Sequence, residues 1–218
     1  MENNYTEIVF VLDRSGSMSG LEKETVAGFN SLIQKQKEEP GAALVTTVLF
    51  NRDCNCIHDR INIGAVPAMT ERDYRVCGYT ALLDAVGRTI DHIAGIHKYI
   101  REEDRPRKVL FIIATDGLEN ASYRYSFDQV SRLIQSKKEA GWEFLFFGAN
   151  IDAIGEASGF GISPDFAVDY HPDARGTAVI YDTMEKAIHN VRTTPAPLGS
   201  DWKAEAVKDF DSRTSDRR

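Results

Sequence analysis

The chain has 218 residues, of which 42% are hydrophobic and 27% charged, and its formal net charge is −7. This composition is ordinary for a soluble globular protein, and the length suits one α/β domain with a full core. The acidic balance argues against nucleic-acid binding, which needs clustered Lys and Arg to contact phosphates. The apolar runs are far shorter than the roughly 20 residues needed to cross a membrane, so no membrane association is expected.

The first residues, MENNYTE, have neither a basic start nor an apolar stretch, so we expect no secretory signal. The chain contains three cysteines, Cys54, Cys56 and Cys77, an odd and small number that does not suggest a disulfide framework. The simplest interpretation is a protein of the reducing cytoplasm.

The first part of the chain predicts two buried strands with a helix between them. Residues 8–12 and 44–50 are apolar without alternation, as expected for strands covered on both faces. Apolar residues recur with helical spacing within 21–37. The sequence Asn51-Arg52-Asp53 then favours a hairpin turn, so that residues 56–61 return as an antiparallel edge strand.

The rest of the chain continues the alternation of strands and helices. Helical stripes are predicted within 80–100 and 126–139, and strands at 109–114 and 144–147. A weaker strand is predicted at 166–170. A fourth helical stripe follows Asp173, formed by Ile180, Met184, Ala187 and Val191.

Strands that alternate with helices of 10 to 15 residues imply right-handed crossovers. We therefore predict an α/β fold with a Rossmann-like, doubly wound, mostly parallel sheet, one antiparallel edge strand and helices on both faces. From Thr193 the sequence gains prolines and charges and loses periodicity. We expect a domain over residues 1–192 and a charged tail over 193–218. The tail could be disordered or dock on a partner, with a short helix near 202–210.

Polar side chains follow the predicted strands at the edge where an open α/β sheet binds its ligands. Asp13, Ser15 and Ser17 follow the first strand at alternate positions, Asp116 follows the strand VLFIIA, and Thr80 stands at the start of the second helix. Two carboxylates and three hydroxyls therefore converge on one rim from three separate loops.

These oxygens are suited to Mg²⁺ or Mn²⁺, because hard divalent ions prefer oxygen and Mg²⁺ often keeps waters in its shell. The alternate positions 13, 15 and 17 fit an extended backbone that curls around an ion, and Gly16 gives the bend its freedom. The alternative is structural: the Asp-x-Ser-x-Ser run could open the next helix as an N-cap, and Thr80 could cap the second helix.

Three segments, VFVLDRSGSMSG, GYTALLDAVGRTI and VLFIIATDGLENAS, resemble the motif segments of the von Willebrand factor type A domain. Their order and spacing are similar to those of its metal-ion-dependent adhesion site, over roughly residues 5–192. The resemblance implies that Ser15 and Ser17 bind the metal through their hydroxyls and that Asp13 binds directly or through water. Thr80 and Asp116 would complete the set, and a carboxylate of a partner protein would fill the sixth position. With the expected cytoplasmic location, the chain is similar to bacterial intracellular members of the family rather than to extracellular adhesion domains.

The sequence offers little support for catalysis at such a metal, although an open coordination position can activate water. A phosphatase with an aspartyl nucleophile needs a second carboxylate two residues after the first, and Ser15 stands there. The chain has no GxxxxGK[ST] loop, and the run Gly16-Ser17-Met18-Ser19-Gly20 has Met18 where a nucleophile elbow needs serine. We therefore expect no enzymatic activity.

Several further residues have two interpretations each. Glu119 could occupy the open metal position or, as we expect, face solvent, and Arg14 should point away from the ion. Cys54, Cys56 and His58 alternate and could form a zinc or iron–sulfur site, but packing on an edge strand with His58 exposed is the expected arrangement. The basic clusters at 105–108 and 137–138 are expected to be solvated surfaces.

The favoured function is a non-catalytic protein-interaction module that binds an acidic residue of a partner through a divalent metal. Two alternatives remain open at this point: a metal-dependent hydrolase of phosphate esters, and a homo-oligomer in which Glu119 or a tail acid of one copy fills the metal site of another. The sequence leaves the oligomeric state undetermined.

Overall fold

The computed structural model describes residues 5–215; residues 1–4 of the predicted domain and 216–218 of the predicted tail lie outside the described part. Within the described part, six strands form one sheet. The strands are β1 (Thr6–Asp13), β2 (Ala43–Phe50), β3 (Cys54–Asn62), β4 (Lys108–Thr115), β5 (Trp142–Ala149) and β6 (Ala167–Tyr170). Their order is β3-β2-β1-β4-β5-β6. Neighbouring strands are parallel except β2 and β3, which are antiparallel. The predicted fold class is confirmed.

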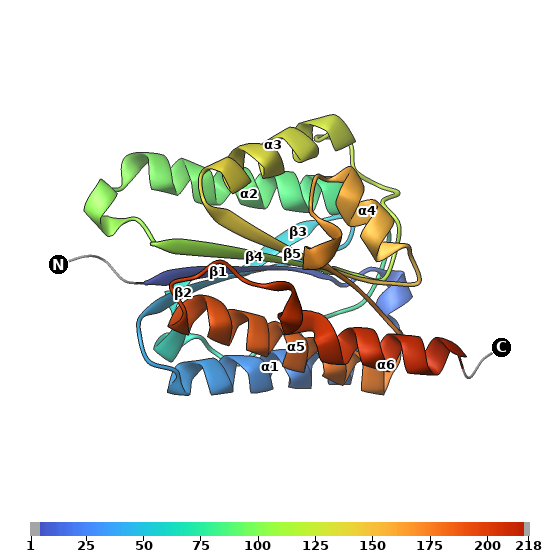
Figure 1. The fold of residues 1–218 in the computed structure, drawn as a ribbon. Helices are drawn as coiled ribbons and strands as arrows, with labels where there is room; N and C mark the ends of the chain where they lie inside the picture. The colour runs from blue at the N-terminus through green and yellow to red at the C-terminus, as the bar shows by residue number, and fades with distance from the viewer. Residues whose placement is uncertain (1–4, 216–218) are drawn as a thin grey trace.

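Helices cover both faces of the sheet (Figure 1). The helices are α1 (Glu22–Glu38), α2 (Leu82–Tyr99), α3 (Phe127–Glu139), α4 (Ala153–Gly159), α5 (Ala174–Thr193) and α6 (Ala204–Ser215). In Figure 1, α2, α3 and α4 lie on one face and α1, α5 and α6 on the other. The short helix α4 has no counterpart among the predicted elements.

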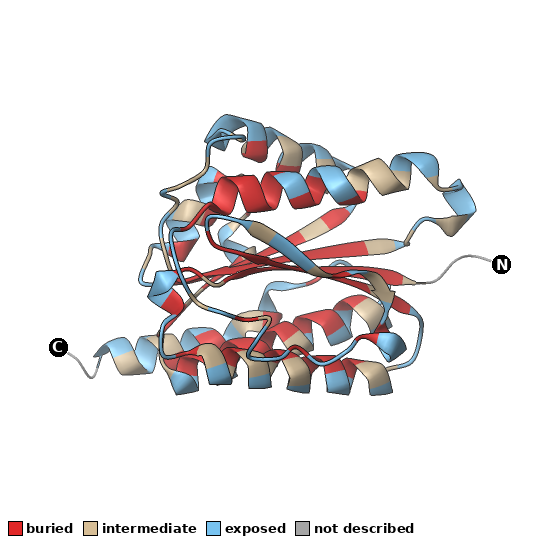
Figure 2. Cartoon of the chain, turned by 180° about the vertical axis from the view of Figure 1, so that it is seen from behind, coloured by how far each residue is buried: buried red, intermediate tan, exposed pale blue. Residues whose placement is uncertain are grey.

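The core consists of two apolar layers separated by the sheet. Phe10 and Leu12 of β1 belong to the layer that includes residues of α1 and α5, whereas Val9 and Val11 belong to the layer that includes residues of α2 and α3. All eight residues of β1 are buried, which explains why its run from Ile8 to Leu12 is apolar without alternation. Figure 2 shows the buried strands in the centre, between helices whose outer faces are exposed.

The order of the strands positions the candidate site. The chain leaves β1 through α1 to reach β2 on one side, whereas β4 pairs with β1 on the other side. The strand order therefore reverses between β1 and β4, and ligands of doubly wound sheets bind outside the carboxyl ends of the strands at such a point. Asp13 ends β1 and Thr115 ends β4, so their loops meet there.

The chain after α5 packs against the same domain. Leu198, Trp202 and Ala206 are buried and belong to the core layer of α1 and α5. The Trp202 ring contacts Phe147 of β5 edge to face, with ring centroids 5.6 Å apart. The division into a domain ending at residue 192 and a separate tail stays a prediction. No helix within residues 5–215 is long and apolar enough to cross a membrane.

Candidate metal centre

Asp13 is held rigidly where β1 ends. Its side chain is buried, with 2% of the residue exposed. The backbone N–H of Ser15 donates to Oδ1 at 2.6 Å, and the Thr115 hydroxyl donates to Oδ2 at 2.6 Å. The Tyr74 hydroxyl donates to the carbonyl oxygen of Asp13. Both carboxylate oxygens are thus oriented by neighbours from β4 and from the loop after β1.

The three predicted hydroxyls and the second carboxylate lie together. The hydroxyl oxygens of Ser15 and Ser17 are 2.9 Å apart, and the Ser17 hydroxyl donates to Oδ1 of Asp116. A Cβ placed on Gly117 would stand 3.1 Å from Thr80 Oγ1, 3.2 Å from Ser17 Oγ and 4.0 Å from Ser15 Oγ. All three hydroxyls therefore border one small space, which stays open because residue 117 is a glycine.

Backbone hydrogen bonds join the three loops that carry these side chains. The N–H of Gly16 donates to the carbonyl of Gly78 at 3.0 Å, which ties the first loop to the segment before Thr80. The N–H of Thr80 donates to Asn120 Oδ1 at 2.9 Å, and the N–H of Asn120 donates back to the carbonyl of Thr80 at 3.0 Å. Thr80 lies just before α2 and does not cap it, because its hydroxyl faces the serines. The structural alternative of a simple N-cap run is also excluded: the cap position of α1 is Leu21.

The site concentrates negative charge in a buried place. Burial, against the hydrogen bond from Ser17 and together with the nearby charge of Asp13, raises the pKa of Asp116 to about 6. Burial also raises the pKa of Asp13, although the hydrogen bonds from Thr115 and Ser15 work in the opposite direction. Oδ2 of Asp116 is buried and has no hydrogen-bond partner among the described residues. Arg14 does not neutralise the pair, because its Nη1 donates to the carbonyl of Asp73 at 3.3 Å, away from the site as expected.

These features fit a hard divalent cation. A cation would supply both the missing positive charge and a partner for the unpaired oxygen of Asp116. Within residues 5–215, no group of three or more His, Cys, Asp or Glu side chains is arranged to hold a metal. A metal here would therefore depend on the hydroxyls of Ser15, Ser17 and Thr80 together with two carboxylates. This donor set suits Mg²⁺ or Mn²⁺ better than a soft metal.

Four positioning residues were missed by the sequence analysis. They are Tyr74, Thr115, Gly117 and Asn120, which bond the site residues or leave space for them. Thr115 and Gly117 flank Asp116, so the sequence shows that they lie near the site. Their roles could not be predicted, because they depend on the direction in which each residue faces at the end of β4.

Glu119 was expected to face solvent, and the structure shows a different role. Its Oε2 accepts from the N–H of Leu83 at 2.9 Å, which satisfies a free donor at the start of α2. The same carboxylate accepts from the N–H of Ala121 and from the N–H and hydroxyl of Ser122 at 2.7 to 2.8 Å. Glu119 therefore ties the loop after β4 to α2 and does not fill a metal position.

His58 was expected to be exposed beside the cysteines, and this prediction is wrong. The pairing of β2 with β3 is irregular around Thr47, where His58 pairs with Thr47 and Cys56 with the adjacent Val48. This bulge turns His58 to the opposite face from Cys56, so that it is 3% exposed and stacks on Phe29 of α1. His58 therefore cannot share a metal with the cysteines. All three cysteines are free thiols.

Comparisons with known proteins identify the fold. No model of a protein family matches the chain, and no curated protein matches its sequence. Among solved structures, the vWF domain of the type V pili tip protein Mfa5 from Porphyromonas gingivalis is similar, with a TM-score of 0.64 and 12% identity over 88% of this chain and 97% of that one.

Two further structures show the same likeness. A von Willebrand factor type A structure from Catenulispora acidiphila has a TM-score of 0.57 and 15% identity, over 85% of this chain and 43% of that one. Proximal thread matrix protein 1 from the mussel byssus, with a zinc-occupied MIDAS motif, has a TM-score of 0.57 and 15% identity, over 85% and 46%. The chain thus spans less than half of these last two proteins. The fold is that of a von Willebrand factor type A domain.

Proposed function

We propose that the protein is a non-catalytic, divalent-metal-dependent interaction module. Asp13, Ser15, Ser17, Thr80 and Asp116 would hold Mg²⁺ or Mn²⁺, and an Asp or Glu of a partner protein would complete the shell. One observation carries the proposal: three hydroxyls from two loops border one space, and the buried Asp116 carboxylate of a third loop, which bonds one of them, keeps an oxygen without a hydrogen-bond partner among the described residues.

The donor set favours a ligand from outside the chain. Two carboxylates at most balance the charge of a divalent ion, and hydroxyls add none, so the ion when bound keeps Lewis acidity toward an anionic oxygen. Ser17 is exposed, which opens this side of the site to the surface. The MIDAS motif of the mussel protein that shares the fold holds zinc, which supports a divalent metal in general.

Exposed apolar side chains on the loops of the site suit a protein partner. Tyr79 is 63% exposed, Leu118 57% and Tyr123 75%, and all three lie on the loops that carry Thr80 and Asp116. Aromatic residues near the centre of an interface often carry much of its binding energy. We infer that they flank the metal-bound carboxylate of the partner.

The hydrolase alternative finds less support at this site. A hydrolase would need a positioned general base near the metal. The carboxylate best placed by sequence, Glu119, accepts four hydrogen bonds that organise the loop, so it is poorly available as a base. The same engagement disfavours Glu119 as the ligand of another copy in a homo-oligomer.

Metal titration tests the site itself. Calorimetric titration of Mg²⁺ and Mn²⁺ into chelator-treated protein should show one binding event. Ser17→Ala should weaken it at least about tenfold, because it removes a hydroxyl from the cluster. Ser19→Ala, an exposed serine on the same loop, is the matched control and should bind as the wild type does. At a metal concentration 100 times the Kd, the free energy of unfolding should rise by about 2.7 kcal/mol. Equal affinity of Ser17→Ala and wild type would refute the assignment.

Partner capture tests the function. Immobilised protein would be exposed to a cell extract in Mg²⁺ and eluted with EDTA, with Asp116→Asn protein as the parallel control. For a captured protein, changing one Asp or Glu to the matching amide should abolish binding. Affinity that EDTA leaves unchanged would count decisively against a metal-dependent interaction.

The cytoplasm stays our proposed location. Three free thiols, two of them on exposed residues, are more compatible with a reducing compartment than with an oxidising one. Fractionation of cells, with immunodetection of the protein, would test this.

A further inference from the structure

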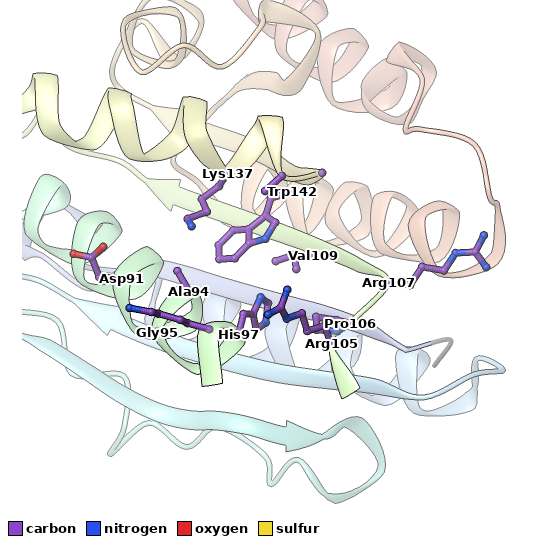
Figure 3. A pocket seen from close by; sticks show the side chains of 13 residues that line it. Asp91, Ala94, Gly95, His97, Arg105, Pro106, Arg107, Val109, Lys137 and Trp142 are labelled. Carbon is purple, nitrogen blue, oxygen red and sulfur yellow. The ribbon is translucent and has the colours of Figure 1, made fainter. Parts of the chain in front are cut away.

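A second candidate site lies at the opposite edge of the sheet from the proposed metal centre. A pocket of about 670 Å³ opens between α2 and α3, where β4 and β5 begin. Figure 3 shows Asp91, Ala94 and His97 of α2 on one side and Lys137 of α3 on the other, with Trp142 between them. Its volume lies in the range of about 300 to 1,000 Å³ that is typical of small-molecule sites.

The pocket collects positive charge in an acidic protein. Lys98, Arg105, Arg107 and Lys137 all line it, although the chain carries a net charge of −7. Within residues 5–215 none of these four side chains forms an ion pair, whereas other bases do, such as Lys35 with Asp182. In Figure 3, Arg105 lies beside His97 and Lys137 approaches Trp142, while Arg107 points outward.

One carboxylate also lines the pocket, and a neighbour already engages it. The Tyr125 hydroxyl donates to Oδ2 of Asp91 at 2.6 Å. This neutral hydroxyl does not cancel the charge of Asp91, but the single acid among four basic lining residues leaves an excess of positive charge. Water screens the repulsion between these cations, which are at least partly exposed, but their combined field still favours an anionic ligand in the pocket.

The apolar wall of the pocket is built from side chains that pack against one another. The Trp142 indole is 7% exposed and contacts His97 edge to face, with ring centroids 5.6 Å apart. Lys137 Nζ lies 5.6 Å from the centre of the same indole, which fixes this cation at the pocket wall. His97 in turn bonds the fully buried carboxylate of Glu7 at 2.6 Å. Ala94, Pro106 and Val109 add further apolar surface.

We propose that this pocket binds a small organic phosphate of about nucleotide size that carries at least two negative charges. Several cations suit a multiply charged group better than a single carboxylate, and the planar guanidinium of Arg105 matches phosphate oxygens. The apolar wall formed by Ala94, Val109 and Trp142 accommodates the uncharged part of the ligand. The site needs no metal and is independent of the interaction proposed at the other edge.

Calorimetry in the presence of EDTA tests the proposal, because chelation removes any contribution of the metal centre. The probes are ADP, pyrophosphate, adenosine and citrate. ADP should bind with a Kd below about 1 mM, and each of the other three should bind at least about tenfold more weakly. Quenching of Trp142 emission by ADP in a Trp202→Phe background would locate the site, since the chain has two tryptophans.

Charge reversal identifies the cations that matter. Lys137→Glu and Arg105→Glu should each weaken ADP binding at least about tenfold, whereas Lys23→Glu, an exposed lysine of α1, should change it less than about twofold. Thermal melts would confirm that the three variants remain folded. Absence of saturable ADP binding, or equal losses in all three variants, would overturn the proposal. If citrate bound as tightly as ADP, the ligand would not have to be a phosphate. If adenosine bound as tightly as ADP, charge would not determine binding.

Discussion

At the scale of single residues, Gly117 decides how much space the metal centre has. In Gly117→Ala, the new methyl group would stand 3.1 Å from Thr80 Oγ1 and 3.2 Å from Ser17 Oγ, closer than ordinary contact. It would push the hydroxyls apart, so the affinity for Mg²⁺ should fall at least about tenfold, or about 1.4 kcal/mol. Calorimetric titration of the variant measures this loss.

The fold should tolerate the same change, because Gly117 is partly exposed and its loop can yield by a few tenths of an ångström. The free energy of unfolding should change by less than about 1 kcal/mol. Gly199→Ala is the control, since a Cβ at that position meets no atom within 4 Å. If Gly117→Ala bound Mg²⁺ as tightly as Gly199→Ala, the ion would have to lie elsewhere.

The convergence of Asp13, Ser15, Ser17 and Asp116 could be predicted, because they end or follow β1 and β4, and the carboxyl ends of neighbouring parallel strands meet at one edge of the sheet. Thr80 precedes α2 instead, so its place at this rim is inferred from its position at a helix start and from the resemblance of the three motif segments. The role of Glu119 could not be predicted in this way. Its carboxylate reaches Leu83 only because the loop after β4 folds back over the start of α2, and no spacing in the sequence encodes that path.

At the scale of elements, β3 illustrates where pattern analysis fails. An antiparallel edge strand after the Asn51-Arg52-Asp53 turn is confirmed. The direction in which its side chains face is different from the prediction, because the register of the pairing shifts on both sides of Thr47. The bulge leaves Cys56 partnered with Val48 and takes His58 into the core against Phe29.

The buried position of His58 makes stability depend on pH. Burial lowers its pKa from the usual value of 6.5. The unfolded chain therefore takes up a proton on His58 as the pH falls below 6.5, while the folded protein resists protonation until its own lower pKa. Between pH 6.5 and the lower pKa of the folded protein, the free energy of unfolding therefore decreases as the pH falls, by up to about 1.4 kcal/mol per pH unit.

Urea denaturation at pH 7.5 and 5.5 would measure this effect. His58→Phe keeps a ring against Phe29 and removes the titrating group, so its loss of stability between the two pH values should be smaller than that of the wild type. His92→Gln, which removes an exposed imidazole of α2, is the comparison variant and should retain the wild-type loss. An unchanged pH dependence in His58→Phe would show that other groups cause it.

The contact between α1 and α5 depends on a glycine. A Cβ on Gly28 would stand 2.7 Å from Cγ of the buried Tyr181. Gly28→Ala should therefore destabilise the protein by about 1 to 3 kcal/mol through overpacking, although alanine favours helix. Gly95→Ala of α2 meets no atom within 4 Å and should stabilise it by about 0.5 to 1 kcal/mol. Urea denaturation of both variants measures whether the free energy of unfolding falls in Gly28→Ala and rises in Gly95→Ala. Stabilisation by Gly28→Ala would mean that α1 and α5 can move apart at little cost.

At the scale of the whole molecule, the central sheet could be predicted and its last covering segment could not. Each central strand is mostly apolar because helices cover both of its faces, so its sequence carries a strong signal. The segment after α5 is mostly polar and contacts the core through few side chains, among them Leu198 and Trp202. Its composition therefore resembles that of an unattached tail.

The burial of Trp202 gives this segment a measurable role in stability. The indole is 5% exposed, contacts Phe147 and donates from Nε1 to the carbonyl of Asp165 at 3.2 Å. Trp202→Ala would leave a cavity at the edge of the sheet and unpair that carbonyl, so it should cost about 3 to 5 kcal/mol. Urea denaturation followed by far-UV circular dichroism measures the cost.

The size of the loss distinguishes a structural part of the fold from an appendage. Tyr99→Ala removes a large aromatic side chain that is 83% exposed and should cost less than about 0.5 kcal/mol. If residues 194–215 complete the core, Trp202→Ala lowers the single cooperative transition of the whole chain, because β5 and β6 lose their cover together. The alternative outcome is that residues 194–215 unfold separately at low urea, while the main transition of Trp202→Ala keeps the same midpoint as that of Tyr99→Ala. In that case the core is stable without the segment.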